Sequence, residues 1–169
     1  EEDVSTKFNI DQLDEIKNYY NTEGYVIVKD IVARDICDKA RSLWEKQVKP
    51  FKGFIYRQAG TRAEKNILND QGWIMNPILN LQSLNPKYFS DLRDHADHKI
   101  FSNPKIKKVF ECLLEDKPKI VQSMYFEGNS ATWEHQDSYY LDSERIGSMS
   151  AAWVALEDIK AEAGRFFVC

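Results

Sequence analysis

The chain has 169 residues, of which 43% are hydrophobic, and 23 basic against 27 acidic residues give it a formal charge of −4. This length predicts one domain, residues 1–169, with a single hydrophobic core. The slightly acidic balance and the lack of long Lys/Arg runs exclude a nucleic-acid-binding surface, so we expect a small-molecule partner.

Membrane proteins and disulfide-rich secreted proteins are also excluded. No apolar stretch approaches the roughly 20 residues of a membrane helix, and the acidic N-terminal sequence lacks a signal-peptide pattern. Three cysteines, Cys37, Cys112 and Cys169, form no CxxC pair, which argues against a disulfide framework and a structural zinc site. We therefore expect a cytoplasmic protein in a reducing compartment.

The first elements alternate between helix and strand. Apolar residues at helical spacing predict a helix over about 10–23 that ends at Gly24. The β-branched and aromatic run at 25–28 predicts a short strand. A second amphipathic pattern predicts a helix over about 34–48, which Pro50 closes.

The middle of the chain is harder to assign. Glycines and prolines interrupt the apolar pattern over 51–85, which predicts long loops with one strand at 54–57. Two helices are then expected, at about 86–97 and 104–114. Asn103 followed by proline is a typical start for the second of these helices.

The residues after Pro118 change to strand patterns, so the chain divides into a helical and loop part, 1–117, and a strand-rich part, 118–169. Four strands are expected, at 120–126, 132–137, 148–156 and 165–169. Antiparallel strands at this spacing are typical of a sandwich or barrel, which gives an α+β class with helices packed on the β-structure. The last strand would leave an apolar edge unpaired, so we expect the barrel to be incomplete within these residues.

One of the three histidines, His135, lies two residues before Asp137. On a strand, residues i and i+2 project to the same face, so the imidazole and the carboxylate could share one metal ion. Non-haem Fe(II) oxygenases use such a pair with one distant histidine and leave three coordination positions open. By itself the pattern is weak, because chance pairs of this kind on a surface are frequent.

The residues around this pair are more informative. Residues 120–144 read IVQSMYFEGNSATWEHQDSYYLDSE and contain the pair followed by aromatic residues. Residues 147–169 read GSMSAAWVALEDIKAEAGRFFVC, with the run WVALED and a turn at Gly164 into an apolar strand. Together these segments resemble the phytanoyl-CoA dioxygenase family of Fe(II)- and 2-oxoglutarate-dependent oxygenases.

The resemblance implies a double-stranded β-helix, a jelly-roll barrel that holds iron at its mouth. His135 and Asp137 would be the first two metal ligands, with 2-oxoglutarate and O2 as cosubstrates. Gln122 and Trp153 match positions near the 2-oxoglutarate pocket of relatives. Without the resemblance, Gln122 is equally a polar residue at a strand end, and Trp153 is more simply a core aromatic.

The chain departs from the family after its last expected strand. Relatives continue with a Pro-Gly-Ser-His turn, a distal histidine ligand and a basic residue that pairs with 2-oxoglutarate, and none of these occurs in the sequence. We therefore expect the third ligand to lie beyond Cys169. His95 and His98 are three residues apart in a charge-rich helical segment, which is typical of a solvated helix face.

The resemblance implies hydroxylation of a small molecule, coupled to oxidative decarboxylation of 2-oxoglutarate. Asp137 favours hydroxylation over halogenation, since halogenating relatives carry a small residue at this position. We expect a small polar or anionic substrate, with Tyr139 and Tyr140 as candidate contacts. Surface or packing roles are alternatives for both and for three further candidates, Arg57, Arg62 and Arg145.

Two other functions remain open on the sequence. A truncated jelly roll without the distal ligand would be a non-catalytic binding or scaffold module. A cupin-like isomerase would need several histidines on neighbouring strands, and the strand-rich part of this chain contains one. The oligomeric state is left open.

Overall fold

The structure is a computed structural model that describes residues 4–128, 132–139, 141–163 and 168. The chain forms two compact units, and each unit combines segments that are distant in sequence. Unit 1 consists of Glu1–Arg34, Ser102–Lys119 and Trp133–Cys169, and unit 2 consists of Asp35–Phe101 and Ile120–Thr132. Within the described part of the chain, no helix is long and apolar enough to cross a bilayer.

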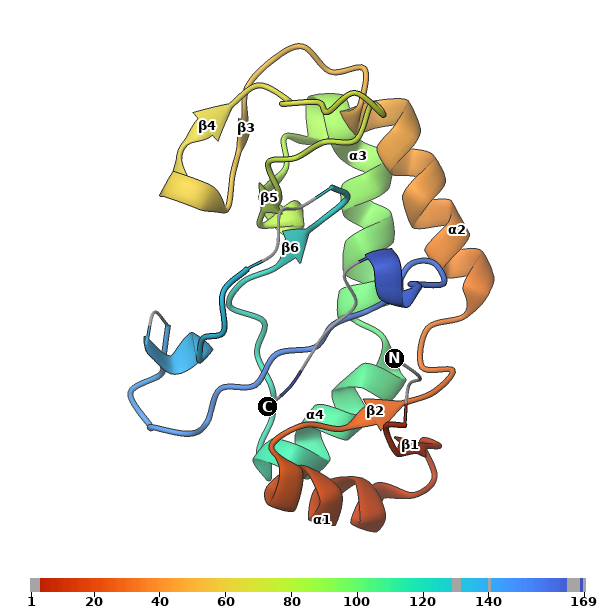
Figure 1. Cartoon of the computed structure of the whole chain (residues 1–169), viewed down its shortest axis with the longest axis vertical. Coiled ribbons are helices and arrows are strands. Elements are labelled where there is room, and N and C mark those ends of the chain that lie inside the picture. Colours follow the sequence, from red (N-terminus) through yellow and green to blue (C-terminus); the bar gives the residue numbers. More distant parts are fainter. Residues whose placement is uncertain (1–3, 129–131, 140, 164–167, 169) are drawn as a thin grey trace. The chain divides into compact units, whose positions relative to one another are not determined.

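Unit 1 contains two helices that pack on each other, α1 (Leu13–Glu23) and α4 (Pro104–Leu114) (Figure 1). The helix predicted from residue 10 is confirmed, but it begins at Leu13. It ends at Gly24, whose φ of 78° is a left-handed conformation that glycine adopts without steric cost. The predicted bounds of α4 are confirmed, and the Asn103 side chain accepts a hydrogen bond from the Lys105 amide at 2.9 Å.

The predicted strand near residue 25 is confirmed as β2 (Ile27–Val28), which pairs in parallel with β1 (Lys7–Phe8). The hydroxyl groups of Tyr20 in α1 and Ser150 form a hydrogen bond of 2.9 Å. This hydrogen bond ties the irregular segment after residue 133 to the helical part of unit 1.

Unit 2 is built on two helices that each end in a π-helical turn. The first is α2 (Arg34–Leu43), continued by η1 (Trp44–Val48), and the second is α3 (Pro86–His95), continued by η4 (Ala96–Phe101). Helix α3 packs against η1. The predicted helix over 34–48 is therefore confirmed in extent, and the one predicted over 86–97 is confirmed but continues to Phe101. Both have wider final turns than the sequence indicated.

The core of unit 2 lies between these helices and two small sheets. Strand β3 (Ile55–Tyr56) pairs antiparallel with β4 (Ala63–Glu64), and β5 (Ile78–Leu79) pairs antiparallel with β6 (Met124–Tyr125) (Figure 1). The Trp44 ring stacks on Tyr125 with centroids 3.9 Å apart. The buried core residues are Leu43, Trp44, Val48, Ile55, Ile74, Ile78, Leu81, Leu84, Phe89, Leu92 and Ala96.

The structure differs most from the sequence prediction in the strands expected for the barrel. The strand over 120–126 shortens to β6, and the strands over 132–137 and 148–156 are wrong for the residues that the structure describes. These two segments join no ladder with any described residue, and a strand is stable only when its backbone N–H and C=O groups find partners. The fourth expected strand, 165–169, lies outside the described residues except for Val168. The described structure is thus a mixture of helices and two-stranded sheets.

Candidate functional site

His135 and Asp137 lie together in unit 1. The Nε2 atom of His135 is 3.3 Å from Oδ1 of Asp137. The segment is a turn rather than a strand: η5 (Asp137–Tyr139) is a single 3-10 turn, and the Leu141 amide donates to the Asp137 carbonyl at 2.9 Å. His135 thus lies in irregular backbone just before the turn that Asp137 begins, whereas the sequence predicted that both are on one face of a strand.

The imidazole of His135 is oriented by the backbone. Its Nδ1 atom lies 2.6 Å from the Trp133 carbonyl oxygen, which can only accept, so Nδ1 carries the proton and donates. This hydrogen bond holds the ring with its other nitrogen, Nε2, facing Asp137. Metal-binding histidines are commonly held in this way, with the second ring N–H donated to a backbone carbonyl.

The spacing of the pair fits a shared divalent ion. With metal–ligand bonds of about 2.1 Å, two neighbouring ligands of an octahedral ion have donor atoms about 3 Å apart. The side chains of His135 and Asp137 are 37% and 73% exposed, so an ion can reach both from solvent. No cluster of three His, Cys, Asp or Glu side chains suited to a metal occurs among the described residues. The pair thus offers two ligands.

The other candidates from the sequence are distributed over both units. Gln122 is exposed and belongs to unit 2, whereas Trp153 is exposed in unit 1. The backbone of Tyr139 forms the end of η5, and Tyr140 lies outside the described residues. His95 is half-buried in unit 2, where its Nε2 lies 2.9 Å from the Ile36 carbonyl oxygen, and His98 is exposed.

Arg57 has a structural role. Its side chain is fully buried in unit 2 and donates to the Asn76 carbonyl at 3.0 Å and to the Asn66 side chain at 2.5 Å. Burial lowers the pKa of the guanidinium below its ordinary value, and the nearby Glu64 carboxylate opposes this shift. Of the other arginines weighed as substrate contacts, Arg62 is exposed and bonds Glu64, and Arg145 is exposed in unit 1.

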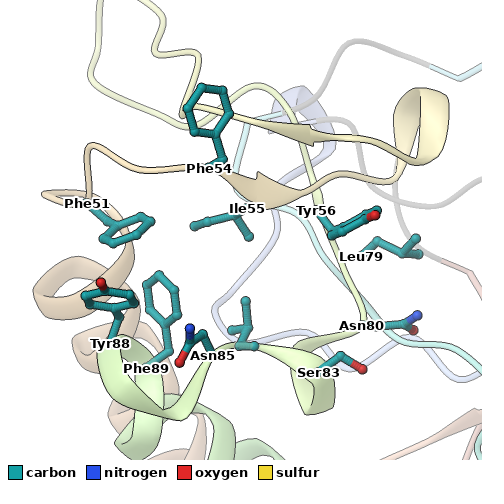
Figure 2. Close-up of a pocket in the computed structure, with 11 residues that line it drawn as sticks. Phe51, Phe54, Ile55, Tyr56, Leu79, Asn80, Ser83, Asn85, Tyr88 and Phe89 are labelled. Carbon is teal, nitrogen blue, oxygen red and sulfur yellow. The ribbon is translucent and has the colours of Figure 1, made fainter.

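Unit 2 contains a pocket that the sequence did not predict (Figure 2). Its volume is about 390 Å³, and its walls come from β3, β5, the short helix η3 (Leu81–Ser83) and the start of α3. The lining residues up to Asn85 fall where the sequence indicated long loops with one strand, and Tyr88 and Phe89 fall in the helix predicted over 86–97. The aromatic residues at 51, 54, 56, 88 and 89 were the available signal, but spacing alone does not show that they meet.

Comparison with known proteins points to one family. The model of the phytanoyl-CoA dioxygenase (PhyH) family matches residues 20–169. The chain is 34% identical over 110 residues to phytanoyl-CoA dioxygenase domain-containing protein 1 of Danio rerio, a match that covers 60% of this chain and 36% of that protein. A homolog of that protein in Caenorhabditis briggsae is 31% identical over 77 residues, which are 43% of this chain and 27% of the homolog.

These matches span about a third of the length of the curated relatives. No solved structure matches the chain.

Proposed function

The chain belongs to the phytanoyl-CoA dioxygenase family, and we propose on this basis that the protein is a non-haem Fe(II)- and 2-oxoglutarate-dependent dioxygenase that hydroxylates a small molecule. Proteins of this family generally use Fe(II) and 2-oxoglutarate. We extend the proposal to the family's jelly-roll fold, in which the antiparallel pair of β5 and β6 would be one part.

The observation that carries the proposal is the geometry of His135 and Asp137. Their donor atoms are 3.3 Å apart, and the Trp133 carbonyl fixes the imidazole tautomer that presents Nε2. Both residues lie within the part of the chain that matches the family. A histidine and a carboxylate in this arrangement are two of the three protein ligands of a non-haem Fe(II) oxygenase site.

In this proposal the chain's residues bind and orient. His135 contributes a neutral nitrogen ligand and Asp137 an anionic oxygen ligand, which together offset part of the charge of Fe(II). Bound Fe(II) with 2-oxoglutarate supplies the oxidative chemistry that activates O2 for hydroxylation. Because Asp137 would fill a coordination position, halide binding there is disfavoured.

Contacts to the small molecules are a further part of the proposal. Gln122 is proposed to contact 2-oxoglutarate and Trp153 to line the same pocket, as the family resemblance implies. Tyr139 and Tyr140 are proposed to contact the substrate, because they lie two and three residues after Asp137 in the sequence.

The experiment compares His135→Ala and Asp137→Ala with His98→Ala as a matched control, because His98 is an exposed histidine in the other unit. Anaerobic calorimetry measures Fe(II) binding, and succinate release from 2-oxoglutarate under air measures turnover. We expect both site variants to lose at least about 10- to 100-fold in Fe(II) affinity, and the control to match the wild type. Wild-type affinity and turnover in His135→Ala would exclude the proposed site.

The pocket of unit 2 favours a second candidate function, a non-catalytic module that binds a small molecule. The same assay separates the two functions. A binding module releases no succinate above a metal-only blank, and its Fe(II) affinity is unchanged in the His135 and Asp137 variants.

A further inference from the structure

The pocket lies in unit 2, whereas the proposed metal ligands His135 and Asp137 belong to unit 1. Its volume of about 390 Å³ falls in the range of small-molecule sites. We propose that this pocket binds a neutral small molecule that contains a planar ring. The chemistry of the walls, the lack of charge in the pocket lining and the shape of helix α3 support this proposal.

Aromatic rings form one wall of the pocket. Phe51 contacts Phe89 edge-on with ring centroids 4.8 Å apart, and it contacts Tyr88 at 5.1 Å. Figure 2 shows these three rings on one side of the pocket, with Tyr56 and Leu79 on the other side. A planar ring between these walls can make the offset-stacked or edge-to-face contacts that aromatic pairs prefer.

Several of the lining aromatics are more exposed than a closed core would leave them. Tyr56 is 61% exposed and Tyr88 48% exposed, although each lines the pocket. A bound ring would remove part of this apolar surface from water, which favours binding. A flexible chain would bury similar area but would lose more conformational entropy on binding.

The lack of charge in the pocket lining favours a neutral ligand. Among the eleven described residues that line it, none is Asp, Glu, Lys, Arg or His. Two cations, Lys65 and Lys87, lie over the rings of Phe54 and Tyr88 at 5.6 and 5.5 Å but do not line the pocket. An anion that entered the pocket would lose hydration without a lining counter-charge.

Two carboxamides supply directional recognition at the pocket. Asn85 uses its side-chain oxygen to cap α3, accepting from the Lys87 amide at 2.9 Å. Asn80 uses its oxygen to accept from the Ser123 amide at 3.1 Å. Because both oxygens are engaged, the amide N–H groups remain the donors for a ligand, which suits a carbonyl, ether or hydroxyl oxygen on the ring.

The pocket wall is held in place by a kink in α3. Phe89 has φ −132° and ψ 27°, so the helix is interrupted there. The Gln47 side chain of η1 accepts from the Leu92 amide at 3.0 Å, which satisfies this backbone N–H after the kink, and donates to the Asp91 carboxylate at 3.1 Å. The kink lets the consecutive residues Tyr88 and Phe89 both line the pocket, although consecutive residues of a regular helix diverge.

Gln47 is therefore a positioning residue for this wall. A wall that is already fixed lowers the ordering cost of binding. The pocket's chemistry also differs from the polar or anionic substrate that the sequence suggested.

The test uses a matched pair of fluorescent probes on the metal-free protein. N-phenyl-1-naphthylamine is neutral, and 8-anilino-1-naphthalenesulfonate carries the same rings with a sulfonate. We expect saturable binding of the neutral probe and at least about tenfold weaker binding of the anion, because the pocket offers no counter-charge. We also expect 2-naphthol to displace the neutral probe more strongly than 1-octanol does.

Single-residue variants test whether the neutral probe binds in this pocket. Tyr88→Ala should weaken binding of the neutral probe about fivefold, within the range that one aromatic contact provides, and Tyr88→Phe should retain binding. Trp73→Ala is the matched control, because Trp73 is 47% exposed in the same unit but does not line the pocket. Unchanged thermal melting confirms that each variant is folded.

Three results would overturn the proposal: no saturable binding of the neutral probe, equal or tighter binding of the anion, or equal losses in Tyr88→Ala and Trp73→Ala. Stronger displacement by 1-octanol than by 2-naphthol would overturn the ring class of the ligand. The inference does not rest on the proposed function, because the probes need neither iron nor 2-oxoglutarate. A failure of one proposal is therefore distinguishable from a failure of the other.

Discussion

Replacing Arg57 by methionine should destabilise the protein strongly. The guanidinium is fully buried in unit 2 and bonds the Asn76 carbonyl and the Asn66 side chain. Asn66 in turn donates to the Val48 carbonyl at 2.7 Å, so Arg57 lies at the centre of a network that reaches η1. Methionine keeps an apolar stem of similar length but donates to neither acceptor.

The magnitude follows from the two closest acceptors that lose their donor, since the third, the Glu64 carbonyl at 3.4 Å, is only weakly bonded. Each buried acceptor left unpaired costs about 1–3 kcal/mol, which gives about 2–6 kcal/mol together. Removing the buried cation also removes its desolvation cost, which offsets part of this loss of stability. The offset is larger because the Arg57 Nε has no hydrogen-bond partner among the described residues. We therefore expect a net loss of about 2–3 kcal/mol in the free energy of unfolding.

Urea unfolding measures the loss, with Arg62→Met as the matched control. Arg62 is exposed and bonds the Glu64 carboxylate at 2.6 Å, and such a surface pair contributes about 0–1 kcal/mol. In a double-mutant cycle, Arg57→Met and Asn66→Ala should cost less together than the sum of the single changes. If Arg57→Met is as stable as Arg62→Met, the hydrogen bonds of Arg57 do not stabilise unit 2.

Three further predictions concern single contacts. Asn103→Ala removes the cap of α4 and should cost about 0.5–2 kcal/mol in thermal unfolding, whereas Asn103→Asp should retain most of the stability. Gln47→Ala leaves the Leu92 amide without its acceptor and should cost about 1–3 kcal/mol in urea unfolding and weaken binding of the neutral probe; full retention of both would contradict the role of the kink. The hydrogen bond from Lys17 lowers the pKa of Glu115 below its ordinary value of 4.5, so this contribution to stability is present above that pH and is lost as the pH falls through the lower folded-state pKa. Lys17→Met should flatten the acid limb of stability against pH, and an unchanged limb would exclude the pair as its source.

Some features of the candidate site could be predicted from the sequence and others could not. The spacing of His135 and Asp137 was enough to predict that their side chains meet, because residues two apart are close in a turn as well as on a strand. The local conformation was predicted wrongly. The role of the Trp133 carbonyl could not be predicted either, because it depends on the rotamer of the imidazole.

Local chemistry fixed most of the helices. Asn103 before a proline starts α4, and Gly24 ends α1 in a left-handed conformation, because caps and glycines act on backbone groups within one turn. The helical periodicity likewise predicted the extent of α2 with η1. None of these features needs a distant partner.

Only the tertiary structure decided the features that depend on distant partners. The pocket forms because β3, β5 and α3 bring together residues up to 38 positions apart, from Phe51 to Phe89. Strand assignment also depends on partners, since a strand pattern becomes a ladder only when another backbone supplies its hydrogen bonds. The sequence by itself therefore determined the helices, their caps and the proximity of His135 and Asp137, while long-range packing decided the sheets, the burial of Arg57 and the pocket.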